Sequence, residues 1–307
     1  MSTAFVDPRI WQIGMLTALL TYGKLALGFP VTAEELLLII AAALGTQWLA
    51  AKAGFASRFD PKSALTSALS IAILLRAAEP WLLAAASAFA IASKYALRID
   101  GKHLWNPSAL AIAAAVFVGG QAWLSPGQWG NTAWFAFAIA GLGGLIVFRA
   151  ERSDVTWAFA AFWCALVVGR SLWIGEPFDV PMHRLKDGGL LLFTFFMISD
   201  PKTTPDTRTG RLVFAGLVAA VAFYIQFALF RTNGLLWALA LVAPLVPVLD
   251  QLLPGARYRW ARPDLGRLPF TRSPAHETSL FRVAGRWRSR LVDPYRARLL
   301  RFLRSQG

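Results

Sequence analysis

The sequence has little cysteine, little histidine and little charge. Its single cysteine, Cys164, excludes an intramolecular disulfide framework and any multi-cysteine zinc or iron–sulfur site built by this chain alone. The three histidines, His103, His183 and His276, stand far apart, so we expect no histidine-clustered metal site. Charged residues make up 16% of the chain, against about 25% in soluble domains. With 56% hydrophobic residues and a mean hydropathy of +0.50, the composition predicts a membrane protein.

The positive charge of the chain is concentrated in its C-terminal tail. After residue 254 there are 13 of the 31 Lys and Arg residues, against only Asp264, Glu277 and Asp293. A basic stretch directly after an apolar helix is typical of contact with an anionic leaflet, so we expect membrane lipids as partners and no nucleic acid. From Leu280, apolar residues recur at helical spacing between arginines, which predicts an interfacial amphipathic helix in residues 253–307.

Apolar segments long enough to cross a bilayer fill residues 1–252, which we expect to form a transmembrane domain. A spanning helix needs about 20 apolar residues. Four further apolar segments are shorter and are bounded by prolines or charged turns, which predicts half-helices or short spans. The full-length candidates are 10–28, 33–51, 131–148, 155–170, 211–230 and 233–249, and the short ones are 63–76, 80–93, 107–119 and 187–199.

About ten segments place both termini on one side of the membrane. Lys and Arg are concentrated in alternate loops, and the positive-inside rule then predicts cytoplasmic termini in the plasma membrane. The loop 171–186 is discordant, because it places Arg184 and Lys186 outside.

The two halves of the apolar region resemble each other. In each half a short segment ends at an acidic residue followed by proline, a helix follows, and an asparagine, Asn106 or Asn233, opens the next helix. Five segments per half predict an all-α fold of two inverted repeats. Broken helices at matching positions of such repeats indicate a binding site near the bilayer midplane.

Two polar segments are the candidates for chemistry. Asn106 is a good helix N-cap followed by Pro107, and a helix that begins within the membrane region presents free N–H groups to an anion such as a phosphate or a reduced flavin. Asp200 ends an apolar run before Pro201, and ionisable groups at such depth indicate function. The alternative for Asp200 is a structural role, accepting hydrogen bonds from the amides that follow it in a turn.

These segments resemble the NqrB/RnfD family. Residues 93–109, "SKYALRIDGKHLWNPSA", are similar to its K…G…H-x-F-N-P-A stretch, and residues 190–205, "LLLFTFFMISDPKTTP", to its F-F-M-x-x-D-P stretch. Residues 231–250 resemble its last helix, and the likeness covers roughly residues 35–252. The sequence of residues 123–130, "WLSPGQWG", is most similar to the RnfD-like membrane proteins associated with enediyne biosynthesis.

The resemblance implies a membrane subunit of an Rnf- or Nqr-type electron transport complex, with other subunits as partners, flavin in the membrane domain and possible coupling to ion movement. The family's Ser-Gly-Ala-Thr motif, whose threonine carries FMN, occurs nowhere in this chain. We therefore expect noncovalent flavin, either FMN or riboflavin. The residues expected around it are Lys102, His103, Asn106, Pro107, Asp200, Pro201, Thr203, Thr204 and Asn233.

Two other classes of function stay open at this point. The same architecture would serve a transporter or channel for a small solute or ion without any cofactor. A membrane scaffold that anchors biosynthetic enzymes through its Arg-rich tail is the third possibility. Because no nucleophile with its base and no acid–base pair is visible, we expect no autonomous catalysis. The resemblance implies a subunit of an oxidoreductase complex.

Overall fold

The computed structural model describes residues 8–56, 58–99, 101–124, 129 and 153–256, all within the compact unit Met1–Trp260. The predicted span 131–148 and the predicted amphipathic helix of the tail lie outside these residues. The described part is helical apart from two short antiparallel ladders. Among the described residues, four helical segments are long and apolar enough to cross a membrane: Ala33–Lys52, Ser153–Ile174, Arg208–Ala228 and Gly234–Leu252. The protein is thus an all-α polytopic membrane protein, as the sequence predicts.

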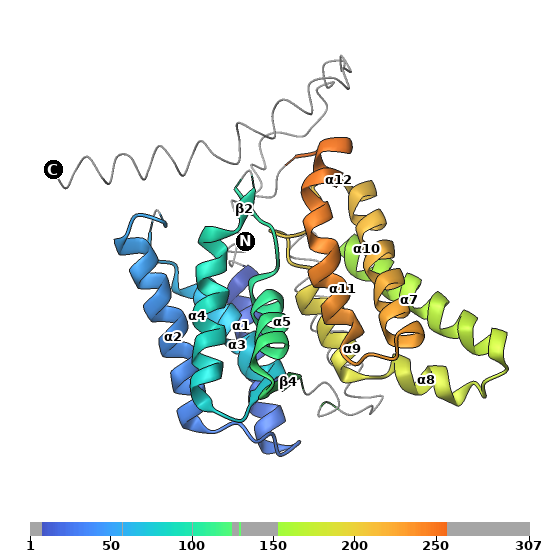
Figure 1. Ribbon diagram of the computed structural model, residues 1–307, viewed down its shortest axis with the longest axis horizontal. Helices are drawn as coiled ribbons and strands as arrows, with labels where there is room; N and C mark the ends of the chain where they lie inside the picture. The colour runs from blue at the N-terminus through green and yellow to red at the C-terminus, as the bar shows by residue number, and fades with distance from the viewer. Residues whose placement is uncertain (1–7, 57, 100, 125–128, 130–152, 257–307) are drawn as a thin grey trace, which may run out of the picture. The chain divides into compact units, whose positions relative to one another are not determined.

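The first half of the described residues contains helices α1 to α5, which Figure 1 shows packed together. Helix α2 begins at a capping box in which Thr32 and Glu35 bond each other's backbone N–H groups. Helices α3, α4 and α5 each begin with a proline, which loses no hydrogen bond at that position. The helices are α1 (Pro8–Leu25), α2 (Ala33–Lys52), α3 (Pro61–Leu74), α4 (Pro80–Ala96) and α5 (Pro107–Gly119), joined by strands β1 (Leu75–Ala77), β2 (Arg98–Ile99), β3 (Lys102–His103) and β4 (Ala122–Leu124).

In the second half, several helices change their winding along their length. Helix α9 continues into the π-helical turn η2, and α10 continues into η3. Its elements are α7 (Ser153–Ile174), α8 (Asp179–Leu185), α9 (Gly188–Leu192), η2 (Phe193–Met197), α10 (Arg208–Phe223), η3 (Tyr224–Ala228), α11 (Gly234–Val242), the 3₁₀ turn η4 (Ala243–Leu245) and α12 (Val246–Leu252).

The predicted short segments are confirmed as short helices. With 14 and 13 residues, α3 and α5 are only about 20 Å long, against about 30 Å of hydrocarbon in a bilayer. A short strand follows each helix, β1 after α3 and β4 after α5. The two strands pair in antiparallel fashion, with Leu75 opposite Leu124. This pairing satisfies backbone groups where neither helix can.

Buried Arg76 stabilises the end of α3. Its guanidinium donates to the carbonyls of Ala72 and Leu75 at 2.8 and 2.7 Å and lies 5.4 Å from the centre of the Phe29 ring. These carbonyls belong to the negative end of the helix dipole, so a buried cation is placed where it complements that dipole. Arg76 therefore acts as the C-terminal cap of a short helix.

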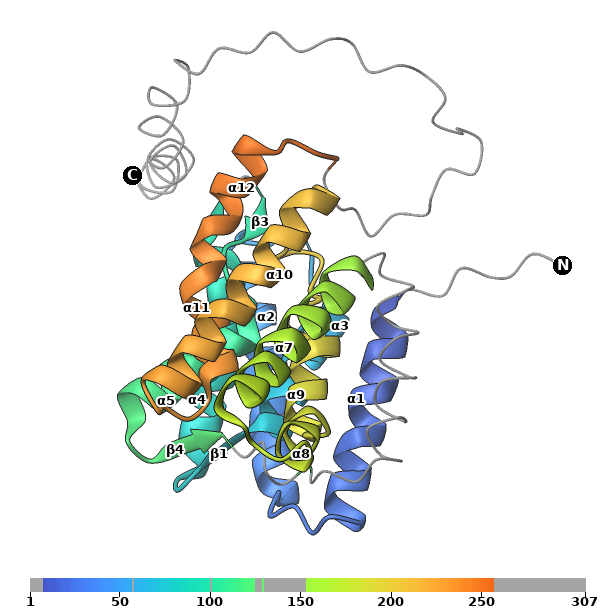
Figure 2. The same ribbon diagram turned by 90° about the vertical axis from the view of Figure 1, so that its right-hand side faces the viewer.

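Small residues allow the helices to pack closely. Ala64, Ala68 and Ala90 in the first half and Ala215 and Ala219 in the second are fully buried. Helix α2 packs on α4 and α4 on α5, and in the same order α7 packs on α10 and α10 on α11. Figure 2 shows α10 between α7 and α11. This matching order of neighbours supports the predicted repeat.

The loop 171–186, which departs from the positive-inside pattern, is held by local contacts. Arg170 pairs with Glu176 at 2.8 Å, and the guanidinium groups of Arg170 and Arg184 lie 4.7 and 5.0 Å from the centre of the Phe227 ring. The Arg170 side chain and Ser171 hydroxyl, by hydrogen bonding, lower the pKa of Glu176. The two arginines are therefore partnered within the protein.

Candidate functional site

The two motif segments meet in space. The side-chain amide of Asn106, at the start of α5, donates to the carbonyl of Met197 at 3.2 Å and lies 3.5 Å from the Asp200 carboxylate. Asn106 belongs to the first half and Asp200 to the second, and 94 residues separate them. Figure 1 shows α5 beside α11. The Trp105 indole also donates to the Ala240 carbonyl at 2.8 Å, which joins the same two halves.

The first turn of α5 is capped by Asn106. The Asn106 side-chain oxygen accepts from the Ala109 N–H at 3.1 Å, and Pro107 has no N–H to offer. The Asp200 carboxylate lies against the Asn106 amide at this positive end of the dipole. The structure thus places a carboxylate of the protein itself, Asp200, beside the start of α5, and the binding of an external anion there stays a prediction.

Asp200 also organises the turn that follows it. One carboxylate oxygen accepts the N–H of Lys202 at 3.0 Å, and its carbonyl accepts the N–H of Thr203 at 3.1 Å. Thr203 and Thr204 are 4% and 0% exposed. Pro201, which follows Asp200 in the sequence, is buried as well. The structural role left open by the sequence is therefore real, and Asp200 combines it with the contact to Asn106.

His103 lies in a positively charged environment. It lies opposite Arg98 in the antiparallel register of β2 and β3. Burial, and then the charges of Arg98, Lys94 and Lys202, lower the pKa of His103 to about 3, so the imidazole is neutral at physiological pH. Its buried Nδ1 atom has no hydrogen-bond partner in the part of the chain that the structure describes. We call Lys94, Arg98, His103, Asp200 and Lys202 the charged cluster.

Lys94 is a residue of the site that the sequence does not predict. It is 5% exposed, and its ammonium group donates to the carbonyl and hydroxyl oxygens of Ser63 at 2.6 and 3.0 Å. Because both partners are neutral, its charge is balanced only by more distant groups. The signal in the sequence is a lysine at the end of an apolar run, which also fits an ordinary interfacial lysine.

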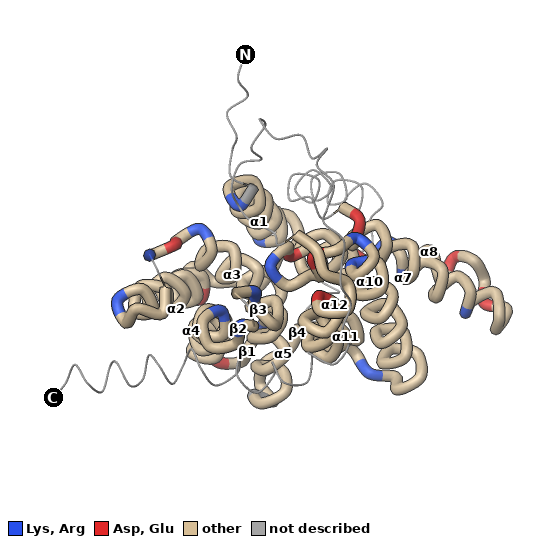
Figure 3. Tube along the Cα trace, turned by 90° about the horizontal axis from the view of Figure 1, so that it is seen from above, with Lys and Arg blue, Asp and Glu red and all other residues tan. Residues whose placement is uncertain are grey.

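Lys202 belongs to the same cluster. Burial lowers the pKa of Lys202, and the nearby Asp200 carboxylate opposes this shift. Lys94 and Lys202 both lie near the Asp200 carboxylate, and the Asp60 carboxylate and the Arg98 guanidinium also act on both lysines. Figure 3 shows blue Lys and Arg segments close together around β2 and β3.

Lys102 is fully engaged by protein groups. Its ammonium nitrogen lies 2.6 Å from an Asp250 oxygen, 3.0 Å from an Asp206 oxygen and 2.8 Å from the Thr204 carbonyl. The side chains of Lys102, Asp206 and Asp250 are 16%, 6% and 17% exposed. We call Lys102, Thr204, Asp206 and Asp250 the Lys102 cage. An ammonium group has three N–H donors, so Lys102 has none left for a cofactor.

Asn233 lies away from the other predicted residues. It precedes α11 with a φ of 62° and makes no side-chain cap. Asp250, next to Lys102, lies 17 positions further along the segment Gly234–Leu252, which corresponds to about 25 Å of helix. The next residue, Gly234, has to be a glycine because a Cβ atom there would lie only 2.9 Å from the Ala222 carbonyl oxygen. The structure thus brings together all the predicted residues except Asn233.

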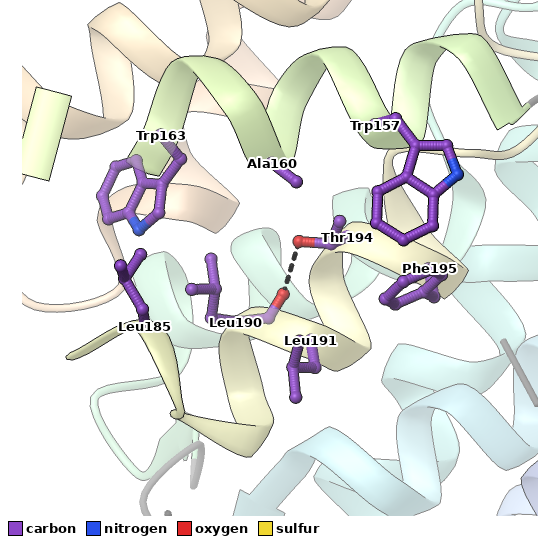
Figure 4. A pocket seen from close by; sticks show the side chains of 8 residues that line it. All are labelled: Trp157, Ala160, Trp163, Leu185, Leu190, Leu191, Thr194 and Phe195. Atoms are coloured by element: carbon purple, nitrogen blue, oxygen red, sulfur yellow. Dashed lines mark hydrogen bonds between the residues drawn. The ribbon is translucent and has the colours of Figure 1, made fainter. Parts of the chain in front are cut away.

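An apolar pocket lies between α7, α8, α9 and η2 (Figure 4). Its volume is about 130 Å³, well below the roughly 300 Å³ at which ligand sites begin. Thr194 supplies a hydroxyl, which already donates to the Leu190 carbonyl at 2.7 Å. The lining residues are Trp157, Ala160, Trp163, Leu185, Leu190, Leu191, Thr194 and Phe195. The pocket is too small and too apolar to hold a flavin with a phosphate.

Comparison with known proteins identifies the family. The model of the NQR2, RnfD, RnfE family matches residues 93–259, more than half of the chain, and the match includes both motif segments. The chain belongs to the NQR2, RnfD, RnfE family. This confirms the resemblance seen in the sequence, whereas the association with enediyne biosynthesis stays a prediction.

Several relatives in this family are named as one subunit of an ion-translocating oxidoreductase complex. The protein of Cronobacter sakazakii is 32% identical over 154 residues, which cover 49% of this chain and 41% of the relative. That of Pectobacterium carotovorum subsp. carotovorum is 32% identical over 127 residues, covering 40% and 34%. That of Tolumonas auensis is 36% identical over 74 residues, covering 24% and 21%. This chain therefore spans at most about two fifths of the length of these relatives.

The charged cluster has the chemistry to bind a polar, anionic group. Its cations suit an anionic group, and the unpartnered Nδ1 atom of His103 suits a polar ring edge. Within the described ranges, no group of three or more His, Cys, Asp or Glu residues is placed to hold a metal ion. The charged cluster is thus the candidate binding site.

Proposed function

We propose that this protein is a membrane subunit of an ion-translocating oxidoreductase complex and binds flavin noncovalently at the charged cluster. The observation that carries the proposal is the contact between Asn106 and Asp200, which unites the two family motifs in one site. Membership of the family supports the coarser part of the proposal, because several relatives are named as subunits of such a complex.

The residues of the site would divide the work of holding the cofactor. Lys94, Arg98 and Lys202 would interact with an anionic phosphate or a reduced ring, because they are basic side chains whose charges act on the buried His103 imidazole. Neutral His103 would donate or accept one hydrogen bond through Nδ1. A bound flavin supplies one- or two-electron redox chemistry, whereas the chain supplies position and electrostatics.

Both termini would lie in the cytoplasm. The Lys and Arg residues of the α2–α3 and α4–α5 loops and the Arg-rich stretch after residue 254 would then all lie on the cytoplasmic side. The charged cluster is at the same end, so electrons would reach it from cytoplasmic partners. Other subunits of the complex are the expected partners.

Purification of the tagged full chain from its own membranes in mild detergent tests the complex. We expect co-purifying integral subunits and a chromophore that dithionite bleaches. Asp200→Ala should lower the chromophore content at least threefold, whereas Asp154→Asn, which alters an ion pair outside the cluster, should not. A colourless single chain that mediates solute flux in proteoliposomes would instead identify a transporter.

A further inference from the structure

The Lys102 cage joins residues from both halves of the fold. Lys102 lies on β3 in the first half, whereas Thr204 and Asp206 follow η2 and Asp250 lies on α12 in the second. The two aspartates are also linked directly, because the backbone N–H of Asp206 donates to a carboxylate oxygen of Asp250 at 2.7 Å. One ammonium group therefore lies between two carboxylates that are held close together.

The neighbouring cation does not replace Lys102. Arg211 pairs with Asp154 at 2.6 Å and donates to the backbone carbonyl of Asp206 at 2.8 Å. None of its described bonds reaches a carboxylate of the cage. Without Lys102, the Asp206 and Asp250 carboxylates would face each other with no cation between them, and like charges at this distance repel.

The contact of Asn106 with the second half depends on the same short segment. Lys102 is four residues before Asn106, and Trp105 donates to the Ala240 carbonyl from between them. These three residues each make a polar bond between the two halves, next to the apolar packing of α5 on α11. The cage is the charged part of this set.

We infer that Lys102 is a positioning residue that docks the two halves and thereby holds Asn106 against Asp200. The docking role stands on the cage geometry alone, and its consequence for flavin rests on the proposed function. The cage oxygens occupy the three N–H donors of Lys102, so it acts on the site through Asn106. This role replaces the expectation that Lys102 binds a cofactor directly.

Distance measurement between the halves tests the docking without any cofactor. Spin labels at Leu49→Cys on α2 and Leu241→Cys on α11, both on exposed positions, are introduced into the full chain with Cys164→Ala. We expect one narrow distance distribution for the parent protein. Lys102→Met should leave less than about half of the molecules at that distance, because removal of one partner leaves uncompensated charge. Lys102→Arg should keep the narrow distribution.

A reversed pair guards against simple misfolding. Lys102→Asp combined with Asp250→Lys should restore the narrow distribution that Lys102→Asp alone loses, and Asp154→Asn is the matched control that should keep it. An unchanged distribution in Lys102→Met, or no recovery in the reversed pair, would overturn the inference.

The flavin readout separates this inference from the proposed function. If the parent protein binds flavin, Lys102→Met should shift its visible spectrum and reduce its retention at least threefold, with Lys102→Arg close to the parent. If the parent binds no flavin while the distances respond as expected, the proposed function fails and the docking role stands. Flavin that is retained with unchanged distances in Lys102→Met rejects the docking role alone.

Discussion

The Asn106 side chain donates to the Met197 carbonyl at 3.2 Å and lies 3.5 Å from the Asp200 carboxylate, while its own oxygen caps α5. One amide thus completes a helix of the first half and contacts the second. An amide suits this position because it accepts on one side and donates on the other. A carboxylate or an apolar side chain cannot do both.

We expect Asn106→Ala and Asn106→Asp to differ in their dependence on pH. Asn106→Ala loses the cap, worth about 1 kcal/mol, at every pH. Asn106→Asp keeps the cap but places a second carboxylate beside Asp200, which raises the pKa of one of them. Its melting temperature should therefore rise toward that of the parent as the pH falls from 8 to 5, relative to Asn106→Ala. Parallel pH profiles for the two variants would contradict the contact with Asp200.

His103 should make the protein sensitive to acid. Burial and the surrounding cations lower the pKa of His103 to about 3 in the folded protein, against an ordinary value of 6.5. Between these values the unfolded chain binds a proton that the folded protein does not, so stability falls as the pH drops below about 6.5. The loss is of the order of a few kcal/mol.

Thermal unfolding at pH 8 and pH 5 measures this effect. His103→Gln should lose less in melting temperature between the two pH values than the parent protein does. His183→Gln is the matched control and should behave like the parent. Equal losses in the parent and His103→Gln would show that His103 is not the buried titrating group.

Arg76 should stabilise the end of α3. Arg76→Leu removes a buried cation, and the carbonyls of Ala72 and Leu75 lose the hydrogen bonds that it donates. We expect a loss of roughly 2–4 kcal/mol in the free energy of unfolding. Arg76→Lys keeps the charge but loses the planar guanidinium group, so its free energy of unfolding should lie between those of the parent protein and Arg76→Leu. Chemical unfolding in detergent measures the series, and a Leu variant as stable as the parent would exclude the capping role.

Much of the fold can be predicted from the sequence, because it depends on local patterns. The apolar runs locate the described spans to within a few residues, and the Asp-Pro and Asn-Pro pairs mark helix boundaries. The α1 segment Pro8–Leu25 is a helix as expected, although it is not among the four segments apolar enough to cross a membrane. Local patterns thus give the elements and their order.

The candidate site can be predicted only in part, because its partners are distant in sequence. Lys102 and Asp250 are 148 residues apart, and no local pattern in the sequence indicates that they pair. The sequence therefore predicts that Lys102 binds a cofactor and does not predict the Lys102 cage. Asn233 shares a pattern with Asn106 but lies near the other end of its helical segment. Lys94 is not predicted because a buried lysine and an interfacial lysine look alike in sequence.

Noncovalent flavin binding by this chain can be measured through the visible absorbance of the detergent-purified full chain, followed by in-gel fluorescence after denaturation. We predict a flavin spectrum in the native protein, release of the flavin on denaturation, and loss of the spectrum in Asp200→Ala but not in Asp154→Asn. Fluorescence that stays with the denatured band would contradict noncovalent binding. No flavin, even after supplementation with FMN and riboflavin, would contradict the proposed redox role of this chain.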